Sequence, residues 1–464
     1  MQPSDPNPIP TPKPKLIRSL VSVILGSLLL RAAAGAMGEN IQFYFNAIHE
    51  ASLNPAHPLR AVVGAAHVYP ISYALGGIII ASFFIAELVG SILLGAWSDR
   101  VGRKLFIIFG PLFGAVAVLI TSVTTTVSLL IFTRLLEGLS TASNAPSTLG
   151  YIAEATSHSE KLRTRIIGFY EIATIGGMAA GFSLGGWLWH NYGQAAIIAG
   201  IPMTSPAFAV NALVYILSLV ILWLGIHEIR EDKKKTPVQP VPAKETIKRY
   251  WHILSNPKVA NFAPAWIAIN AVLGVWINLS ARILTDKHGR PDQLLVGLFD
   301  SYRAGNVQAA YAFFFIIGIL VWSLVFPNVR RNSAMLIGTG GLFLSCLLMF
   351  AINYQPSVDS PLVLPLSILL VITIMVQSGF TPAALAHLAD ITEEYANDRG
   401  AIMGLYSVFL GLGQFFGASL GGVFVDWGGA NGMILFNGLL GLFAAVLLLR
   451  LRKLEKQAAA APAA

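Results

Sequence analysis

The sequence predicts an all-α integral membrane protein with twelve transmembrane helices, arranged as two parallel six-helix repeats. Three observations predict this fold: an apolar composition, twelve long apolar stretches, and a segment that recurs at a fixed offset. Of the 464 residues, 55% are hydrophobic and 12% are charged, and the mean hydropathy is +0.67. Because soluble domains carry about 25% charged residues, this composition indicates a membrane protein.

Twelve apolar stretches are long enough to cross a hydrocarbon core of about 30 Å, which takes about 20 helical residues. The predicted spans are residues 17–43, 71–97, 105–125, 127–153, 166–189, 206–226, 259–284, 308–326, 334–352, 361–388, 401–425 and 431–451. The first span is interrupted by Arg31, and the eighth is short. We expect no cleaved signal peptide, because the first apolar stretch is too long and lacks a small-residue cleavage site.

A polar, Pro- and Lys-containing interruption divides the spans into six and six. The predicted organisation is a Pro-rich cytoplasmic tail at 1–16, an N-terminal six-helix lobe at 17–226, a cytoplasmic linker at 227–258, a C-terminal six-helix lobe at 259–452 and a cytoplasmic tail at 453–464. Within the linker, residues 247–254 are expected to form a short amphipathic helix at the interface.

The two halves carry copies of one segment. Residues 145–186 align without gaps on residues 381–422, which lie 236 residues further along the chain. The matched pairs include Pro146 with Pro382, Glu154 with Asp390, Arg163 with Arg399, and Tyr170 with Tyr406. A shared proline, acid, arginine and tyrosine exceed what two apolar helices share by composition. Six spans separate the copies, so the repeats run in the same direction.

The basic residues predict the orientation in the membrane. With both termini in the cytoplasm, about 24 of the 31 bases fall inside and about five fall outside, which satisfies the positive-inside rule. The five outside bases are Arg60, Arg282, Lys287, Arg290 and Arg303. The protein is therefore expected in the cell (inner) membrane. The net charge of +8 reflects this topology and gives no support to nucleic-acid binding, because the bases form no single face.

The short connection between the second and third spans reads "GAWSDRVGRK". Gly95 permits close helix approach, and Gly102 permits a backbone conformation with positive φ. Arg100, Arg103 and Lys104 hold the turn on the cytoplasmic side. Topology alone does not require Asp99, so we expect this acid to have a further use.

This connection resembles the signature loop of the major facilitator superfamily. Arg134-x-x-x-Gly138 resembles a second motif of that family, and Gly177-x-x-x-Gly181-x-x-x-Gly185-Gly186 resembles the glycine-rich motif of its antiporters. Phe182 stands where that motif has proline, so the antiporter motif is degenerate. The resemblance covers essentially the whole chain and is to the twelve-helix drug:proton antiporter type.

The resemblance implies a conformational latch at the cytoplasmic face. In the family the signature acid meets the inner end of helix eleven, here residues 399–404, and a helix N-terminus favours negative charge. We therefore expect Asp99 to tie the lobes together when the inner gate is shut. The matching loop of the second half, "FPNVRRNSAM", keeps only bases, so the gate is expected to be asymmetric.

Four charged residues within the predicted spans are candidates for proton coupling or the substrate path. Each costs about 2.5 to 3.5 kcal/mol in the membrane unless it has a partner or water. Arg134 and Glu137 lie three residues apart on one helical face, and they form either a proton-sensitive pair or a mutually neutralised structural pair. Glu87 is either a coupling acid or a structural hydrogen bonder. Arg31 either pairs with one of these acids or meets an anionic substrate group.

Three further sets of residues are predicted to line the cavity, to pack helices together and to form cytoplasmic latches. Cavity candidates are Gln42, Trp266, Asn270 and Gln377. Helix-packing glycines are Gly177, Gly181, Gly185, Gly413, Gly417 and Gly421. Glu154 with Arg163, and Asp390 with Arg399, are expected to form cytoplasmic latches. The alternative for these pairs is exposed loop charges with little energetic effect.

The sequence therefore predicts a proton-coupled secondary active transporter that works by alternating access and exports small amphipathic organic molecules. The alternative is a proton symporter that takes up a polar or anionic metabolite, which Arg31 favours. A membrane sensor or a membrane-embedded enzyme is less favoured. No cofactor or metal is expected, since the histidines are scattered and no phosphate-binding loop is present. The expected partners are a small-molecule substrate, protons and the lipid bilayer, with the monomer as the working unit.

Overall fold

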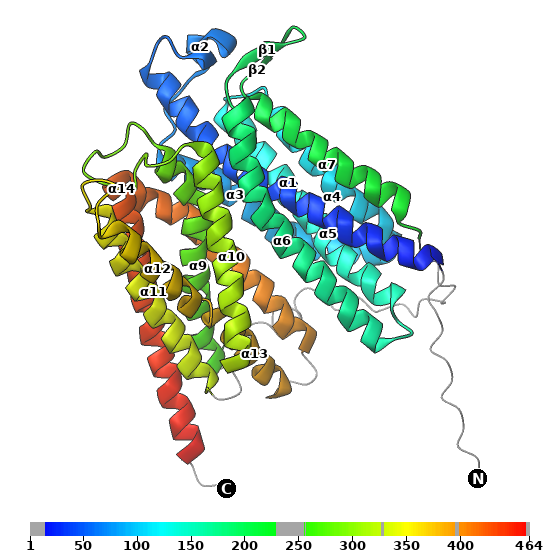
Figure 1. Cartoon of the computed structure of the whole chain (residues 1–464). Helices are drawn as coiled ribbons and strands as arrows, with labels where there is room; N and C mark the ends of the chain where they lie inside the picture. The colour runs from blue at the N-terminus through cyan, green and yellow to red at the C-terminus, as the bar shows by residue number, and fades with distance from the viewer. Residues whose placement is uncertain (1–13, 229–254, 256, 326–328, 395–398, 461–464) are drawn as a thin grey trace, which may run out of the picture.

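A computed structural model describes residues 14–228, 255, 257–325, 329–394 and 399–460, and the side chains of residues 14, 65, 258, 389, 391–394, 399–407 and 458–460 lie outside this description. The chain forms two helical bundles (Figure 1). They converge at the end that carries α2 and the β1–β2 hairpin, called the hairpin side here, and diverge toward the end that carries both termini, called the terminal side. The predicted linker falls almost entirely outside the described residues.

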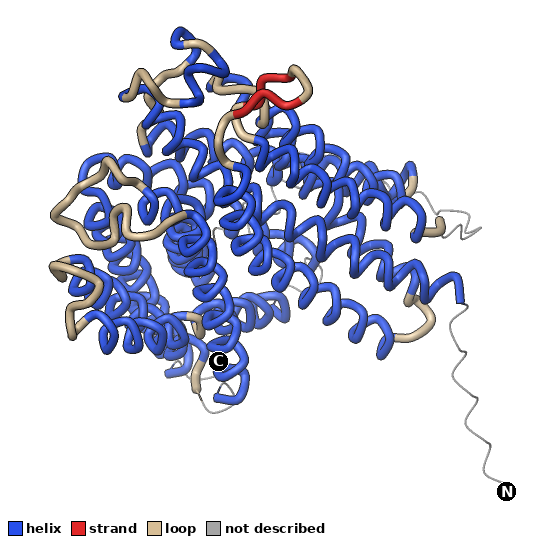
Figure 2. Tube along the Cα trace, turned by 45° about the horizontal axis from the view of Figure 1, so that its top comes forward, coloured by secondary structure: helices blue, strands red, loops and turns tan. Residues whose placement is uncertain are grey.

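The first bundle contains six long helices. They are α1 (Pro14–Leu53), α3 (Tyr73–Val101), α4 (Arg103–Thr121), α5 (Val127–Ala155), α6 (Glu160–Tyr192) and α7 (Pro206–Gly225). The hairpin side of this bundle is capped by the short helix α2 (Pro58–Val63), by the 3-10 turn η1 (Ala65–His67), and by β1 (Ala196–Ile198) paired antiparallel with β2 (Ile201–Met203) (Figure 2).

The second bundle accounts for the remaining six predicted spans. Its helices are α9 (Pro257–Thr285), α10 (Ser301–Val325), α11 (Arg331–Asn353), α12 (Val363–Gln377), α13 (Phe380–Glu394) and α14 (Arg399–Ala460). The tenth span is broken between α12 and α13. The eleventh and twelfth spans form one element that reverses at Gly429, whose φ of 61° and ψ of −137° suit a residue without a side chain.

The apolar character of the helices confirms the fold class. Ten described helices are long and apolar enough to cross a membrane, and one of them, Val408–Gln457, holds two spans. The remaining span is the fourth, α5, which carries Arg134 and Glu137. Two boundaries were predicted too short, because α1 continues to Leu53 and α10 begins at Ser301. Large apolar side chains such as Leu324, which is 80% exposed, face outward, as expected where lipid replaces water.

Glycine stripes hold equivalent helix pairs together in the two bundles. On α6, Gly177, Gly181 and Gly185 lie against the backbone of α1 at Leu28, Ala32 and Ala36. On α14, Gly413 and Gly417 lie against the backbone of α9 at Ile267 and Ala271, and Gly421 lies against Val275. Small residues allow this close approach in the membrane, where packing rather than the hydrophobic effect drives helix association.

Replacing Gly181 by alanine is expected to destabilise the first bundle. A Cβ atom at this position would lie 2.9 Å from the Cα atom of Gly35 and 3.0 Å from the amide nitrogen of Ala36. Because both contacts are backbone atoms, α1 has to move, at a cost of about 1–3 kcal/mol. Gly176→Ala is the matched control on the same helix, since nothing lies within 4 Å of its Cβ position. Thermal unfolding in one detergent measures both variants, and equal midpoints would contradict the contact.

Candidate functional site

The four charged residues predicted inside the membrane come together in the first bundle. Arg31 on α1 hydrogen-bonds with the side chain of Tyr170 on α6 and lies within electrostatic reach of Glu87 on α3. Tyr215 on α7 lies within electrostatic reach of Arg31, Arg134 and Glu137. We call Arg31, Glu87, Arg134 and Glu137 the embedded charge cluster. Sequence spacing related only two of these residues, and the helix packing gathers all four.

Arg134 and Glu137 form the ion pair that their spacing on α5 predicts. Their side chains are 5% and 4% exposed. Arg134 Nε and Glu137 Oε1 have no hydrogen-bond partner among the described residues. The pair is thus neutralised but incompletely hydrogen-bonded, and such a buried pair is costly to break by removing one member. Arg31 and Glu87 are only partly buried.

The acidic residues of the terminal side pair differently from the prediction. Glu154 does not pair with Arg163; its Oε1 atom accepts a hydrogen bond of 2.7 Å from Arg103 Nε. Arg103 reaches it because its guanidinium lies over Gly150, where a side chain would collide with it. In the second bundle, Asp390 forms an ion pair with Arg331, in the corresponding loop. The side chain of Arg399 lies outside the described residues.

The described contacts of the signature loop include an ion pair within its own bundle. Asp99 pairs with Arg103 at 2.8 Å, and both Asp99 and Glu154 are about half exposed. Gly102 has a φ of 126°, which confirms the predicted positive value. Gly95 lies beside Pro146, and Arg100 is exposed. The expected partner of Asp99, residues 399–404, has no described side chains, so the latch between lobes stays a prediction.

The four cavity candidates occupy two kinds of position. Gln42 lies between the bundles, where its Nε2 donates to the carbonyl of Ile277 at 3.0 Å. The other three are buried within the second bundle: Trp266, Asn270 and Gln377 are 1%, 5% and 5% exposed. Trp266 packs against Phe262 with ring centroids 5.1 Å apart. In this conformation these three residues support the packing, and their use in a substrate path stays a prediction.

The hairpin side is closed around Arg282, which was counted among the outside bases. Arg282 lies in the last turn of α9 on this side and is 2% exposed, so it is buried and not a free loop base. Its Nε donates to Asn46 Oδ1 at 3.1 Å and its Nη1 donates to the carbonyl of Ser72 at 2.9 Å. Its guanidinium also donates to the carbonyl of Ile71 and stacks 4.1 Å from the ring of Tyr73. A residue of the second bundle thereby holds α1 and the start of α3.

Asp426 of α14 makes the reciprocal contact. Its two carboxylate oxygens accept hydrogen bonds from the backbone amides of Tyr73 and Ala74 at 2.7 and 2.8 Å. These amides belong to the first turn of α3, which has no intrahelical acceptors for them and favours a negative charge. Tyr73 also donates from its hydroxyl to Asp286 at 2.8 Å. We call Asn46, the segment 71–73, Arg282, Asp286 and Asp426 the hairpin-side seam.

Asp426→Asn is expected to loosen the first turn of α3. The amide keeps one acceptor oxygen but loses the charge and the second acceptor, which weakens a capping interaction of about 0.5–2 kcal/mol. Hydrogen exchange at the amides of Tyr73 and Ala74 should therefore become faster. Asp359→Asn, at an exposed acid on the same side of the membrane, serves as the control. Unchanged exchange in Asp426→Asn would show that the cap contributes nothing.

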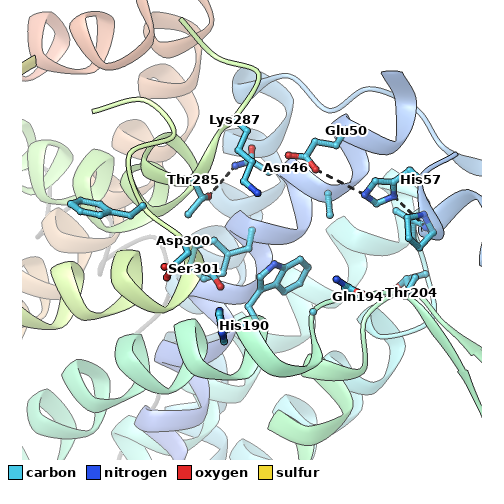
Figure 3. Close-up of a pocket in the computed structure, with 18 residues that line it drawn as sticks. Asn46, Glu50, His57, His190, Gln194, Thr204, Thr285, Lys287, Asp300 and Ser301 are labelled. Carbon is cyan, nitrogen blue, oxygen red and sulfur yellow. Dashed lines mark hydrogen bonds and ion pairs between the residues drawn. The ribbon is translucent and has the colours of Figure 1, made fainter. Parts of the chain in front are cut away.

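A cavity of about 440 Å³ adjoins the seam (Figure 3). Its walls come from both bundles, with Phe43, Glu50 and Trp189 on one side and Lys287 and Asp300 on the other. Glu50 lies 4.0 Å from His57 and 3.5 Å from His288. Burial lowers the pKa of His57, and the nearby Glu50 opposes this shift. Within the described residues, no cluster of His, Cys, Asp or Glu has the arrangement of a metal site.

Two buried charged residues, Glu39 and Arg282, were not among the predicted site residues. Arg282 was missed because it stands three residues from the end of its helix and was counted with the loop bases. Glu39 was overlooked although it stands inside the first predicted span; its side chain is 0% exposed. A simple inventory of every ionisable residue within the spans would have included both.

Two parallel six-helix bundles joined at one end, with charges held inside the membrane-spanning part, define a multi-pass membrane transporter. The chain belongs to the Major Facilitator Superfamily, whose family model matches residues 20–299 and 283–464. Multidrug resistance protein 2 of Bacillus subtilis is 27% identical over 363 residues, which are 75% of this chain and 80% of that protein. The quinolone resistance protein NorA of Staphylococcus aureus is 23% identical over the same shares.

Solved structures share the fold at low sequence identity. The nucleoside transporter NupG superposes with a TM-score of 0.69 at 13% identity, over 94% of this chain and 99% of that chain. A bacterial homologue of the human lysosomal transporter Spinster, in an inward-facing and unoccupied conformation, superposes with a TM-score of 0.67 at 16% identity. The match covers 97% of this chain and 100% of that chain. The family and these relatives are transporters, not enzymes.

Proposed function

We propose that this protein is a proton-coupled exporter of small amphipathic organic molecules. The observation that carries the proposal is the embedded charge cluster, in which the buried pair of Arg134 and Glu137 lies close to the partly exposed Arg31 and Glu87. A carboxyl whose partner and solvent access change with conformation binds and releases protons as the conformation changes. The multidrug and quinolone resistance proteins among the relatives support export.

The positive-inside rule places both termini in the cytoplasm. The hairpin side then faces outward, and the closed seam at Arg282 and Asp426 makes the described conformation one that opens toward the cytoplasm. Export requires this state to load substrate and a second state, with the seam open, to release it. In that second state the terminal side closes, which is where Asp99 is proposed to meet the start of α14.

Uptake of a polar or anionic metabolite by proton symport is the second candidate function. Arg31 favours it, because a partly exposed guanidinium within the membrane is a recognition group for a carboxylate or phosphate. Its hydrogen bond to Tyr170 leaves other donors of the fork-shaped group for such a ligand.

Transport in proteoliposomes with an imposed pH gradient tests the proposal. Ethidium, a small amphipathic cation, is the probe, and its movement should follow the sign and size of the gradient. Movement that continues unchanged after both the pH gradient and the membrane potential are collapsed would exclude proton coupling. In the same assay Glu137→Gln should remove the pH dependence while ethidium binding remains measurable, and an unaltered pH profile would make Glu137 a structural residue.

A further inference from the structure

Helix α1 carries an acid that the embedded charge cluster does not include. Glu39 is 0% exposed, and both of its carboxyl oxygens lack a hydrogen-bond partner among the described residues. An ionised carboxylate without hydrogen bonds is far more costly to bury than the neutral acid. In this conformation Glu39 therefore carries its proton.

Glu39 lies where the two bundles meet. A Cβ atom on Gly185 of α6 would lie 2.7 Å from the Cβ atom of Glu39, and one on the next residue, Gly186, would lie 3.2 Å from the Cα atom of Gly305 on α10. One turn further along the same face of α1, Phe43 packs against residues of α9 and α10. Glu39 is thus packed against α6 one helical turn from the contact between the bundles.

The groups around this contact are polar but uncharged. Gln42 of α1 and Gln308 of α10 both donate to the carbonyl of Ile277 on α9, at 3.0 and 3.4 Å. Gln308 Oε1 has no partner within the described part of the structure. Both amide side chains are neutral, so neither offers a countercharge to a carboxylate.

The titratable groups nearest the hairpin side of the packed helices are engaged elsewhere. His190 of α6 lines the cavity at the membrane surface. Arg282 of α9 is bound to the segment 71–72 and Asn46. Arg303 of α10 is 72% exposed and pairs with Asp300. Because these groups are engaged elsewhere and Glu39 has no hydrogen-bond partner among the described residues, a charge on it in the closed state would have no compensation.

We propose that Glu39 loads the coupling proton from the hairpin side, and that the bundles close there only over the protonated acid. When the seam is open, the carboxylate takes a proton from hydronium in the water on that side, which leaves a neutral carboxylic acid and a water molecule. The bundles then close and bury the acid. This inference rests on the proposed proton coupling and names the residue that links it to the outer closure.

Spin labels on the two bundles test the pH dependence of closure without any substrate. With Cys346→Ser removing the single cysteine, labels at Leu53→Cys and Val358→Cys report the distance across the hairpin side, since both positions are exposed and lie on different bundles. With native Glu39, a longer-distance population should grow as the pH rises. In Glu39→Gln, which copies the shape and neutrality of the protonated acid, the short distance should persist at every pH.

The control and the transport assay separate the possible failures. Asp292→Asn, at an exposed acid of the loop that leads into α10, should keep the pH profile seen with native Glu39. The inference is overturned if the distances are independent of pH with Glu39 present, if Glu39→Gln keeps the profile, or if only Asp292→Asn abolishes it. If ethidium transport by the unmodified protein ignores the pH gradient while the spin-label result holds, the proposed coupling fails and the protonation-linked closure stands.

Discussion

Arg282→Met is expected to open the hairpin side. Methionine keeps most of the volume but leaves the carbonyls of Ile71 and Ser72 and the side chain of Asn46 without their donor. Removing one partner from a buried, charged hydrogen-bond network costs about 2–5 kcal/mol. Because about 1.4 kcal/mol corresponds to a factor of ten in an equilibrium constant, the ratio of open to closed seam should rise more than tenfold. Asp286 and Asp426 also lose the cation between them, which adds repulsion.

The spin-label pair at positions 53 and 358 measures this shift as growth of the longer-distance population at fixed pH. Arg282→Lys should give an intermediate result, because the ammonium keeps the charge but cannot reproduce the fork of donors. Arg303→Met is the matched control, since Arg303 is a surface arginine whose partner, Asp300, lies immediately before the same helix. A distance distribution identical to that with native Arg282 would mean that the apolar and glycine contacts hold the seam without the arginine.

Arg134→Met is expected to cause the largest loss of stability in the first bundle. It leaves Glu137, 4% exposed, without the only ion-pair partner described for it. Breaking a buried pair by removing one member costs about 3–5 kcal/mol. Replacing both members by apolar residues, as Arg134→Met with Glu137→Leu, removes the uncompensated charge, and this double variant should recover most of the lost stability.

Thermal unfolding of the two single variants and the double variant in one detergent gives the coupling energy between the residues. The exposed pair of Asp300 and Arg303 provides the comparison, since surface pairs contribute only about 0–1 kcal/mol. If the stability loss of the double variant equals the sum of the losses of the two single variants, the two side chains contribute to stability independently. A double variant that is stable but inactive would separate the structural role of the pair from its use in transport.

Much of the fold follows from local patterns in the sequence. The twelve apolar stretches predict the helices because membrane-spanning length is a property of each segment alone. The contact between Arg134 and Glu137 follows from their spacing on one helix, and the positive φ of Gly102 follows from a turn of few residues. The glycine spacings on α6 and α14 likewise indicate a helix contact, since four residues return to the same face.

Contacts between distant segments could not be predicted in this way. Glu154 was assigned to Arg163, its neighbour along the chain, whereas Arg103 reaches it across Gly150 from another helix. Arg282 was counted with the loop bases because it stands near a helix end, and its burial beneath the segment before α3 was not predicted. In both cases the sequence position of a charge does not tell which segment folds back over it. The roles of the embedded charge cluster and of the cavity candidates remain predictions.

The reversal at Gly429 leaves almost no slack between the last two membrane crossings. Asp426, which holds the first turn of α3, stands three residues before this bend, and the final helix begins immediately after it. No extended loop separates Asp426 from the C-terminal helix. We therefore expect a movement of α3, which is hydrogen-bonded to Asp426, to rotate the C-terminal helix about Gly429. Inserting a few flexible residues beside Gly429 should therefore uncouple the movement of the twelfth span from that of the eleventh.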